Sequence, residues 1–126
     1  MRTRLIVALT PVYECHHCPE DVVVKHTEIY QRHGHYFRGE ISVHGLGDRS
    51  FEFIEFQLAM QAEFRDILQH MIASCEMYAA EVARRAATGL RERKIQFEGV
   101  DAMVWENDVV GAGCYLDAKE SSDANN

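Results

Sequence analysis

Two cysteines separated by two residues form the most suggestive chemical motif of the chain. Cys15 and Cys18 lie in the run Cys15-His16-His17-Cys18, and two thiolates at this spacing can chelate one Zn²⁺ ion from a tight turn. A structural zinc site needs further ligands, yet the sequence contains no second CxxC motif and no HxxxH pair. Because six of the seven histidines fall between residues 16 and 44, we look for the missing ligands there.

A predicted hairpin decides which histidine lies near the cysteines. Residues 22–31 and 36–44 are rich in β-branched and aromatic residues, and Gly34 between them suits a tight turn. With the turn at this glycine, His44 would lie opposite Val23 and therefore beside the CxxC motif. The residues predicted for a zinc site are therefore Cys15, Cys18 and His44.

His33 and His35 flank Gly34 and form a second, separate candidate for a metal-binding pair. In the predicted hairpin they belong to the turn, roughly 35 Å from Cys18 at about 3.3 Å per residue. We therefore interpret them as turn residues and do not include them in the predicted zinc site.

The motifs of the common enzyme classes are missing from the sequence. There is no G-x-S-x-G elbow, no P-loop, no G-x-G-x-x-G and no HExxH. The CxxC motif also differs from a redox-active one, because a strand-like run rather than a helix follows it. We therefore predict a non-enzymatic protein that needs no cofactor, with bound Zn²⁺ as the alternative.

The acidic residues are concentrated in the last quarter of the chain. The formal net charge is −7, and residues 95–126 carry seven acidic residues but only one basic residue, Lys119. Such a region repels phosphate backbones and attracts basic surfaces. The sequence thus predicts no direct nucleic-acid binding and a protein partner with a basic surface. The residues predicted to contact this partner are Glu98, Asp101, Glu106, Asp108 and Asp117.

Apolar residues from Phe53 to Val82 recur at steps of three and four residues, which predicts one amphipathic helix. Whether residues 50–56 open this helix or form a short strand stays open. A helix over residues 57–88 would span roughly 48 Å, more than the diameter of roughly 36 Å expected for such a domain. Either the helix breaks, for example at Ala73-Ser74, or its alanine-rich end forms a homodimer interface. The residues predicted for that interface are Tyr78, Ala79, Val82, Ala83 and Ala86.

Strands are predicted on both sides of this helix. Residues 3–14 begin with an apolar run that is typical of a covered central strand. Residues 93–98 alternate as in a strand, and residues 102–106 and 109–116 predict a hairpin that turns at Asn107-Asp108.

The predicted fold is a single α+β domain over residues 1–117. An antiparallel sheet, made of the N-terminal strands and the C-terminal hairpin, packs against one long amphipathic helix. Residues 118–126 lack an apolar pattern and are predicted to be a mobile tail.

Two functions from different classes fit these observations. The first is a non-enzymatic protein-binding domain, in concrete terms a small acidic inhibitor of the phage or mobile-element type that engages a basic surface of a nucleic-acid-binding protein. The alternative is a small zinc-binding metalloprotein centred on Cys15 and Cys18. No apolar run is long enough for a membrane span or a signal-peptide core, so we expect a cytoplasmic protein without a membrane partner.

Overall fold

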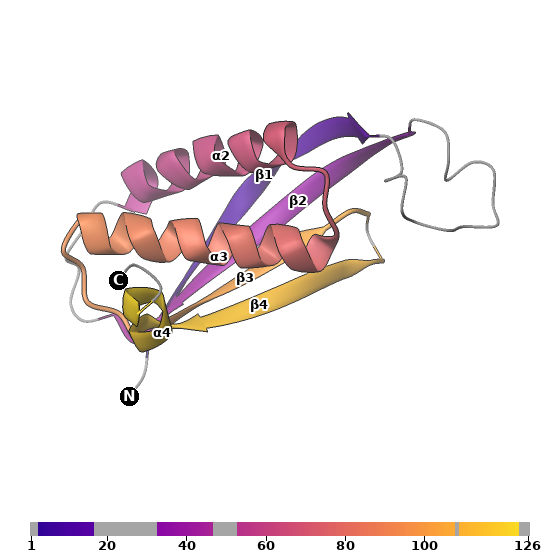
Figure 1. Cartoon of the computed structure of the whole chain (residues 1–126). Helices are drawn as coiled ribbons and strands as arrows, with labels where there is room; N and C mark the ends of the chain where they lie inside the picture. The colour runs from indigo at the N-terminus through magenta and orange to yellow at the C-terminus, as the bar shows by residue number, and fades with distance from the viewer. Residues whose placement is uncertain (1–2, 17–32, 47–52, 108, 124–126) are drawn as a thin grey trace.

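The chain folds into a four-stranded antiparallel sheet with two helices across one face (Figure 1). The computed structural model describes residues 3–16, 33–46, 53–107 and 109–123. The elements are β1 (Arg4–His16), β2 (His33–His44), α2 (Phe53–His70), α3 (Cys75–Glu92), β3 (Gly99–Trp105), β4 (Gly111–Asp117) and α4 (Ala118–Asp123). The predicted α+β class with an antiparallel sheet is confirmed. None of the helices described is both long and apolar enough to cross a membrane.

β1 pairs directly with β2, and this pairing replaces the predicted first hairpin. Arg4 is the partner of His44, and His16 is the partner of His33. His33-Gly34-His35 therefore opens a strand and does not form a turn. Residues 22–31, which were predicted to pair with β2, lie outside the described residues. The extended character of β2 was predicted correctly, but its partner strand was not.

The ladder between β1 and β2 is interrupted at one place. Leu9 pairs with Gly39 and Val12 pairs with Phe37, so that two residues of β1 oppose one residue of β2. This arrangement is a β-bulge, and Pro11 fits there because it has no N–H group for the ladder. β1 is an outer strand of the described sheet, so the prediction of a central strand was wrong.

The hairpin predicted from residues 102–106 and 109–116 is confirmed, because β3 and β4 pair in antiparallel orientation. Trp105 pairs with Gly111 across β3 and β4. Asn107 shapes the turn, because its Oδ1 accepts hydrogen bonds of 2.7 Å from the N–H groups of both Val109 and Val110.

Residues 93–98 do not form the predicted strand. They make a turn and an irregular connection, in which Lys94 has a positive φ of 58°. β3 begins only at Gly99, which pairs with His44 on one side and with Asp117 on the other.

The predicted amphipathic helix is divided into α2 and α3. The break between them, residues 71–74, includes Ala73-Ser74, one of the two outcomes that the sequence predicted. Ser74 is the N-cap of α3, and its side chain accepts a 3.3 Å hydrogen bond from the N–H of Met77, which stabilises the first helical turn. α3 continues past Gly89 and ends at Glu92. Residues 53–56 are helical, while residues 50–52 lie outside the described part of the chain.

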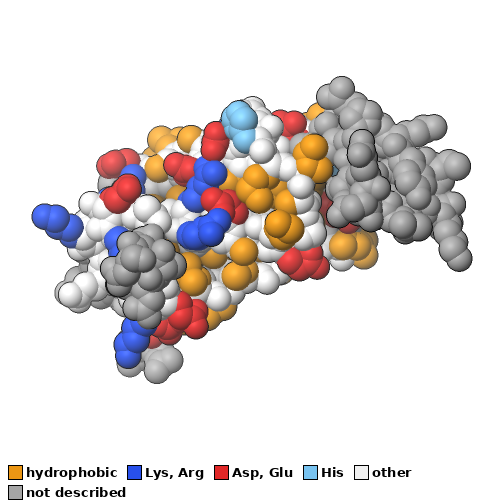
Figure 2. Space-filling model, viewed as in Figure 1, with side chains coloured by type: hydrophobic (Ala, Val, Ile, Leu, Met, Phe, Trp, Pro, Cys, Tyr) orange, Lys and Arg blue, Asp and Glu red, His pale blue; other side chains and the backbone are white. Residues whose placement is uncertain are grey.

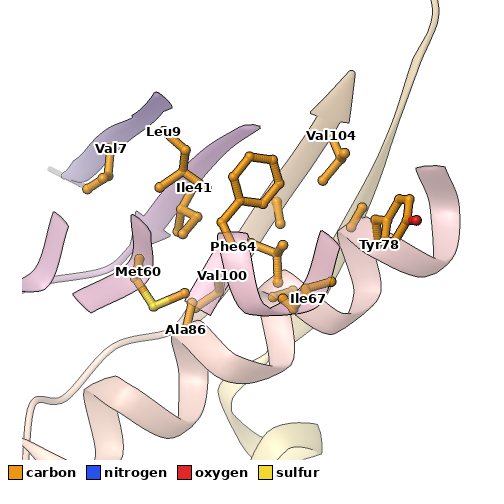
Figure 3. Close-up of a cluster of buried hydrophobic side chains, with 14 of the residues drawn as sticks. Val7, Leu9, Ile41, Met60, Phe64, Ile67, Tyr78, Ala86, Val100 and Val104 are labelled. Atoms are coloured by element: carbon orange, nitrogen blue, oxygen red, sulfur yellow. The ribbon is translucent and has the colours of Figure 1, made fainter. Parts of the chain in front are cut away.

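Both helices bury the predicted apolar stripe against the sheet (Figure 3). Phe64 and Ile67 of α2 and Val82 of α3 are fully buried. The alanine-rich part of α3 lies in the same core, and none of its predicted interface residues is more than 1% exposed. The predicted homodimer interface is therefore wrong, because these side chains already pack inside their own chain. They are Tyr78, Ala79, Val82, Ala83 and Ala86.

Candidate active site

One end of the sheet gathers histidines and a carboxylate from separate segments. Glu14 is the partner of His35, and His16 is the partner of His33, in the last rungs of the β1–β2 ladder. Residues along a strand alternate between faces, and directly paired residues share a face. Positions 14, 16, 33 and 35 therefore belong to one face of the sheet.

This face is the one covered by the helices. Val12 and Phe37 are the next pair in the same row, and both are buried in the core. The ring of Phe37 lies 5.8 Å from that of half-buried His35 and 5.5 Å from that of Tyr78, in edge-to-face arrangements. These contacts connect the imidazole of His35 to the first turn of α3.

Tyr78 fixes the connection between α2 and α3 beside this end of the sheet. Its hydroxyl donates a 2.7 Å hydrogen bond to the carbonyl oxygen of Met71 and accepts one of 3.2 Å from the N–H of Ala73. Burial raises the pKa of Tyr78, and the charges of Cys75 and Glu14 act in the same direction against the hydrogen bond from Ala73. The contribution of Glu14 to the pKa of Tyr78 agrees with the position of Glu14 on the helix-facing side of the sheet.

Cys75 and Glu106 come to this end from the start of α3 and the segment after β3. Burial raises the pKa of the Cys75 thiol to about 11, and the carboxylates of Glu106 and Glu76 act in the same direction. A hydrogen bond from the backbone of Glu106 opposes this rise. The thiol is therefore protonated at neutral pH and is not a ready nucleophile.

These residue types suit metal binding and proton transfer. Catalytic zinc sites commonly use three protein ligands, drawn from imidazole, carboxylate and thiolate groups. The histidines at positions 16, 33 and 35, with Glu14 on the same face, are a donor set of this kind. Among the side chains that the structure describes, which exclude those of His16 and His33, no group of three or more His, Cys, Asp or Glu residues is gathered.

The predicted zinc site of Cys15, Cys18 and His44 is not formed. Cys15 pairs with Gly34, whereas His44 pairs with Arg4 at the other end of the same ladder. The length of β1 between Arg4 and Cys15 is roughly 37 Å at about 3.4 Å per residue, so one metal ion cannot bind both residues. Cys18 lies outside the described residues.

His44 instead belongs to a polar cluster on the open face of the sheet. Its Nε2 lies 2.9 Å from Oδ2 of Asp101, and its ring centroid lies 5.9 Å from that of Tyr115. The cluster stands at the opposite end from Glu14 and His35.

The acidic residues predicted to bind a basic partner do not share one surface. Asp101 is paired with His44, and Asp117 accepts a 2.9 Å hydrogen bond from the N–H of Lys119 at the start of α4. Glu98 lies at this same end, because its N–H donates to the carbonyl oxygen of His44. Glu106 lies at the other end of β3, and Asp108 is outside the described residues. On the face shown in Figure 2, acidic and basic side chains are interspersed.

A groove of about 390 Å³ lies between α2 and α3, toward the C-terminal end of α3. Three of its four charged side chains, those of Glu63, Arg85 and Arg93, already have partners within the chain. Arg85 binds Glu63 and Asp66 at 2.7 Å each, and Arg93 donates a 3.0 Å hydrogen bond to the carbonyl oxygen of Gly89. We therefore place the candidate active site at the end of the sheet and not in this groove.

The sequence contained a signal for this site that was interpreted differently. Two histidines separated by one residue lie on the same face of an extended strand, and His33-Gly34-His35 fits this rule once it is recognised as a strand. Glu106 was predicted to contact a basic partner, Tyr78 was predicted for the homodimer interface, and Cys75 was counted in the apolar stripe of the helix. The strand register and the helix break bring these groups to one end of the sheet.

Solved structures share this fold over almost the whole chain. A Plasmodium vivax 6-pyruvoyltetrahydropterin synthase with a catalytic glutamate replaced by alanine is 10% identical, with a TM-score of 0.67, over 93% of this chain and 99% of that one. The Plasmodium falciparum 6-pyruvoyl tetrahydropterin synthase is 10% identical, with a TM-score of 0.63, over 92% of this chain and 98% of that one. No family model and no curated protein matches the sequence.

These comparisons contradict the prediction of a non-enzymatic inhibitor of the phage or mobile-element type. These solved structures, which resemble the chain along nearly their full length, are enzymes, and they give no support to a partner with a basic surface. The fold of this chain is that of the 6-pyruvoyltetrahydropterin synthases.

Proposed function

We propose that the chain is a metal-dependent enzyme with a pterin-type substrate, and that its active site lies at the end of the sheet that carries Glu14 and His35. The observation that carries the proposal is the register of β1 and β2, which pairs Glu14 with His35 and His16 with His33. The likeness in fold to 6-pyruvoyltetrahydropterin synthases supports the substrate class.

The histidines at positions 16, 33 and 35 are the proposed metal ligands. Imidazole nitrogens suit Zn²⁺, and the strand positions place all three residues on one face. When bound, the ion would polarise an oxygen atom of the substrate. Phe37 contacts the ring of His35 and so orients this ligand against the core.

Two further side chains have proposed roles toward the substrate. The carboxylate of Glu106, half-buried beside α3, is suited to accept hydrogen bonds from the ring N–H groups of a heterocycle. Cys75 is protonated at neutral pH because of its raised pKa, so it is suited to donate a hydrogen bond or a proton rather than to attack as a thiolate.

Elemental analysis of protein purified without added metal tests the metal site. We expect about one equivalent of zinc in the wild type and about a tenth or less in His33→Ala and His35→Ala. His70→Ala is the control, because His70 is exposed at the end of α2. Full zinc content in His35→Ala protein would contradict the proposed ligand set.

Calorimetric titration with a soluble pterin tests the substrate class separately. Glu106→Gln removes a charged acceptor, so we expect binding to weaken about tenfold or more. Glu98→Gln is the control, because Glu98 is exposed and lies at the other end of the sheet. A wild-type protein that contains zinc but binds no pterin would refute the substrate class while retaining the metal site.

We also propose that the chain self-associates through the edges of its sheet. β1 and β4 are the outer strands of the described sheet, and an apolar groove of about 140 Å³ runs beside β1. Ile6 and Ile54, which line it, are 49% and 65% exposed. A homodimer is the smallest assembly of this kind, and light scattering should show that Ile54→Lys shifts it toward the monomer. A wild-type mass equal to that of one chain would refute the proposed assembly.

The cytoplasmic location of the protein stays a prediction.

A further inference from the structure

Two glutamine side chains of α2 cover part of the outer edge of β1. Oε1 of Gln61 accepts a 2.6 Å hydrogen bond from the N–H of Thr10, and its Nε2 donates one of 3.1 Å to the carbonyl oxygen of the same residue. Nε2 of Gln57 donates a 3.3 Å hydrogen bond to the carbonyl oxygen of Ala8. The amide of Gln61 thus satisfies both backbone groups of Thr10, as a residue of a neighbouring strand would.

Thr10 lies two residues after Ala8, and every second residue of an outer strand directs its N–H and C=O groups away from the neighbouring strand. Thr10 and Pro11 together oppose Arg38, so the regular exchange of hydrogen bonds with β2 stops there. Thr10 is also exposed. Exposed N–H and C=O groups along an outer strand are a template for pairing with another chain.

Nearer the N-terminus, the outer edge of β1 has a different neighbour, an apolar groove. Beside Leu5, Ile6 and Val7 the strand faces the apolar groove formed with Phe53 and Ile54. The outer strand at the other side of the sheet is β4. A second copy of the chain therefore offers an extended edge that can approach β1.

We propose that Gln57 and Gln61 shield β1 from Ala8 to Thr10 against pairing with a second copy of the chain, and confine strand addition at this edge to Arg4–Val7. This shielding acts through hydrogen bonds between the side-chain amides of α2 and the backbone of β1, and it is separate from the active site proposed above.

Methionine substitutions remove these hydrogen bonds while keeping side-chain length and helix propensity. In Gln61→Met, we expect the amide hydrogen of Thr10 to exchange at least about tenfold faster than in the wild type, measured by NMR at a dilution where both have the same mass. Gln69→Met is the matched control, because Gln69 is exposed on the same helix, and it should leave this exchange unchanged. Unchanged hydrogen exchange at Thr10 in Gln61→Met would contradict the proposed shielding of β1.

The consequence for association is measured by light scattering over a concentration series. The double variant Gln57→Met/Gln61→Met should form larger species at about tenfold lower concentration than the wild type or Gln69→Met. Should this variant not fold, Gln57→Met alone, which removes one hydrogen bond, carries the same test with a smaller shift. Faster exchange at Thr10 without any added association would overturn the proposed role against strand addition.

Discussion

The hydroxyl group of Tyr78 donates a 2.7 Å hydrogen bond to the carbonyl oxygen of Met71. The same hydroxyl accepts a hydrogen bond from Ala73, so one buried side chain satisfies two backbone groups in the break between α2 and α3. The ring also contacts Phe37. Tyr78 therefore ties the start of α3, including Cys75, to the end of the sheet that carries His35.

Tyr78→Phe keeps the ring but leaves these two backbone groups without their partner. We expect the free energy of unfolding to fall by about 1–3 kcal/mol, the cost of unsatisfied buried polar groups, measured by urea denaturation. Tyr36→Phe is the control, because Tyr36 is 67% exposed. Equal stability of Tyr78→Phe and the wild type would show that water replaces the hydroxyl.

Gly39 lies where the sheet and α2 approach each other closely. A Cβ atom at this position would lie 2.9 Å from Cδ1 of Leu9 and 3.3 Å from Cζ of Phe64. Gly39→Ala should therefore lower the free energy of unfolding by about 1–3 kcal/mol through overpacking. Gly113→Ala is the matched strand control, because its nearest neighbour is the sulfur atom of the flexible Met103 side chain. A smaller loss in Gly39→Ala than in Gly113→Ala would contradict this explanation.

Cys75 should react slowly with alkylating reagents near neutral pH. Its pKa lies at about 11 instead of the ordinary 9.0, so the thiolate is rare until the pH approaches that value. Glu106→Gln removes a negative charge that raises this pKa, and alkylation should then begin at lower pH. Iodoacetamide labelling followed by peptide mass spectrometry measures the rate for this cysteine alone. Glu98→Gln should leave the profile unchanged, and a wild-type rate equal to that of the unfolded chain at pH 8 would refute the shift.

The same pKa shift has a consequence for stability at alkaline pH. The folded state holds the thiol proton more tightly than the unfolded state, so the contribution of Cys75 is fully present below pH 9.0. It is lost as the pH rises from 9.0 to about 11. Cys75→Ala protein should show a smaller loss of stability over this interval than the wild type, measured by urea denaturation.

Arg85 of α3 binds three carboxylates, two of which belong to α2 and so join the helices. Its guanidinium binds Glu63 and Asp66 at 2.7 Å each and Glu81 at 3.0 Å. Arg85→Met should lower the free energy of unfolding by about 1 kcal/mol at neutral pH, because the network is partly exposed. Arg65→Met, which replaces an exposed arginine of α2, should change this free energy less.

The Arg85 network also predicts a response to acid. The hydrogen bond from Arg85 holds the pKa of Asp66 below its usual value of 3.8. The resulting stability is present above pH 3.8 and is lost as the pH falls through the lower pKa of the folded state. The stability difference between the wild type and Arg85→Met should therefore narrow on acidification. A constant difference from pH 7 to pH 2 would assign the effect to packing.

The helical part of the fold could be predicted because its signal is local. The spacing of Phe56, Met60, Phe64 and Ile67 places them on one helical face, and these residues form the core. The break was expected from length, and Ser74 marks the new N-cap. The exact ends were harder, because the predicted helix stops at residue 88 whereas α3 continues to Glu92.

The partner of β2 could not be predicted from local pattern. The sequence of residues 22–31 predicts a strand, as that of residues 3–14 does, and the closeness of residues 22–31 to β2 in the chain favoured a hairpin turning at Gly34. This choice placed His44 beside the cysteines and His35 at a turn. The observed register reverses both placements, which is why the zinc site was sought with the wrong histidine.

The two ends of the described chain lie together, far from the candidate active site (Figure 1). The hydroxyl of Thr3 donates to the carbonyl oxygen of Leu46, and the N–H of Ala118 at the start of α4 donates to that of Glu98. Both contacts lie at the His44 end of the sheet, whereas Glu14 and His35 lie at the other. An affinity handle or a fluorophore attached at either end of the described chain would therefore stand at the opposite end of the sheet from the candidate active site, which suits immobilisation for surface-based binding measurements.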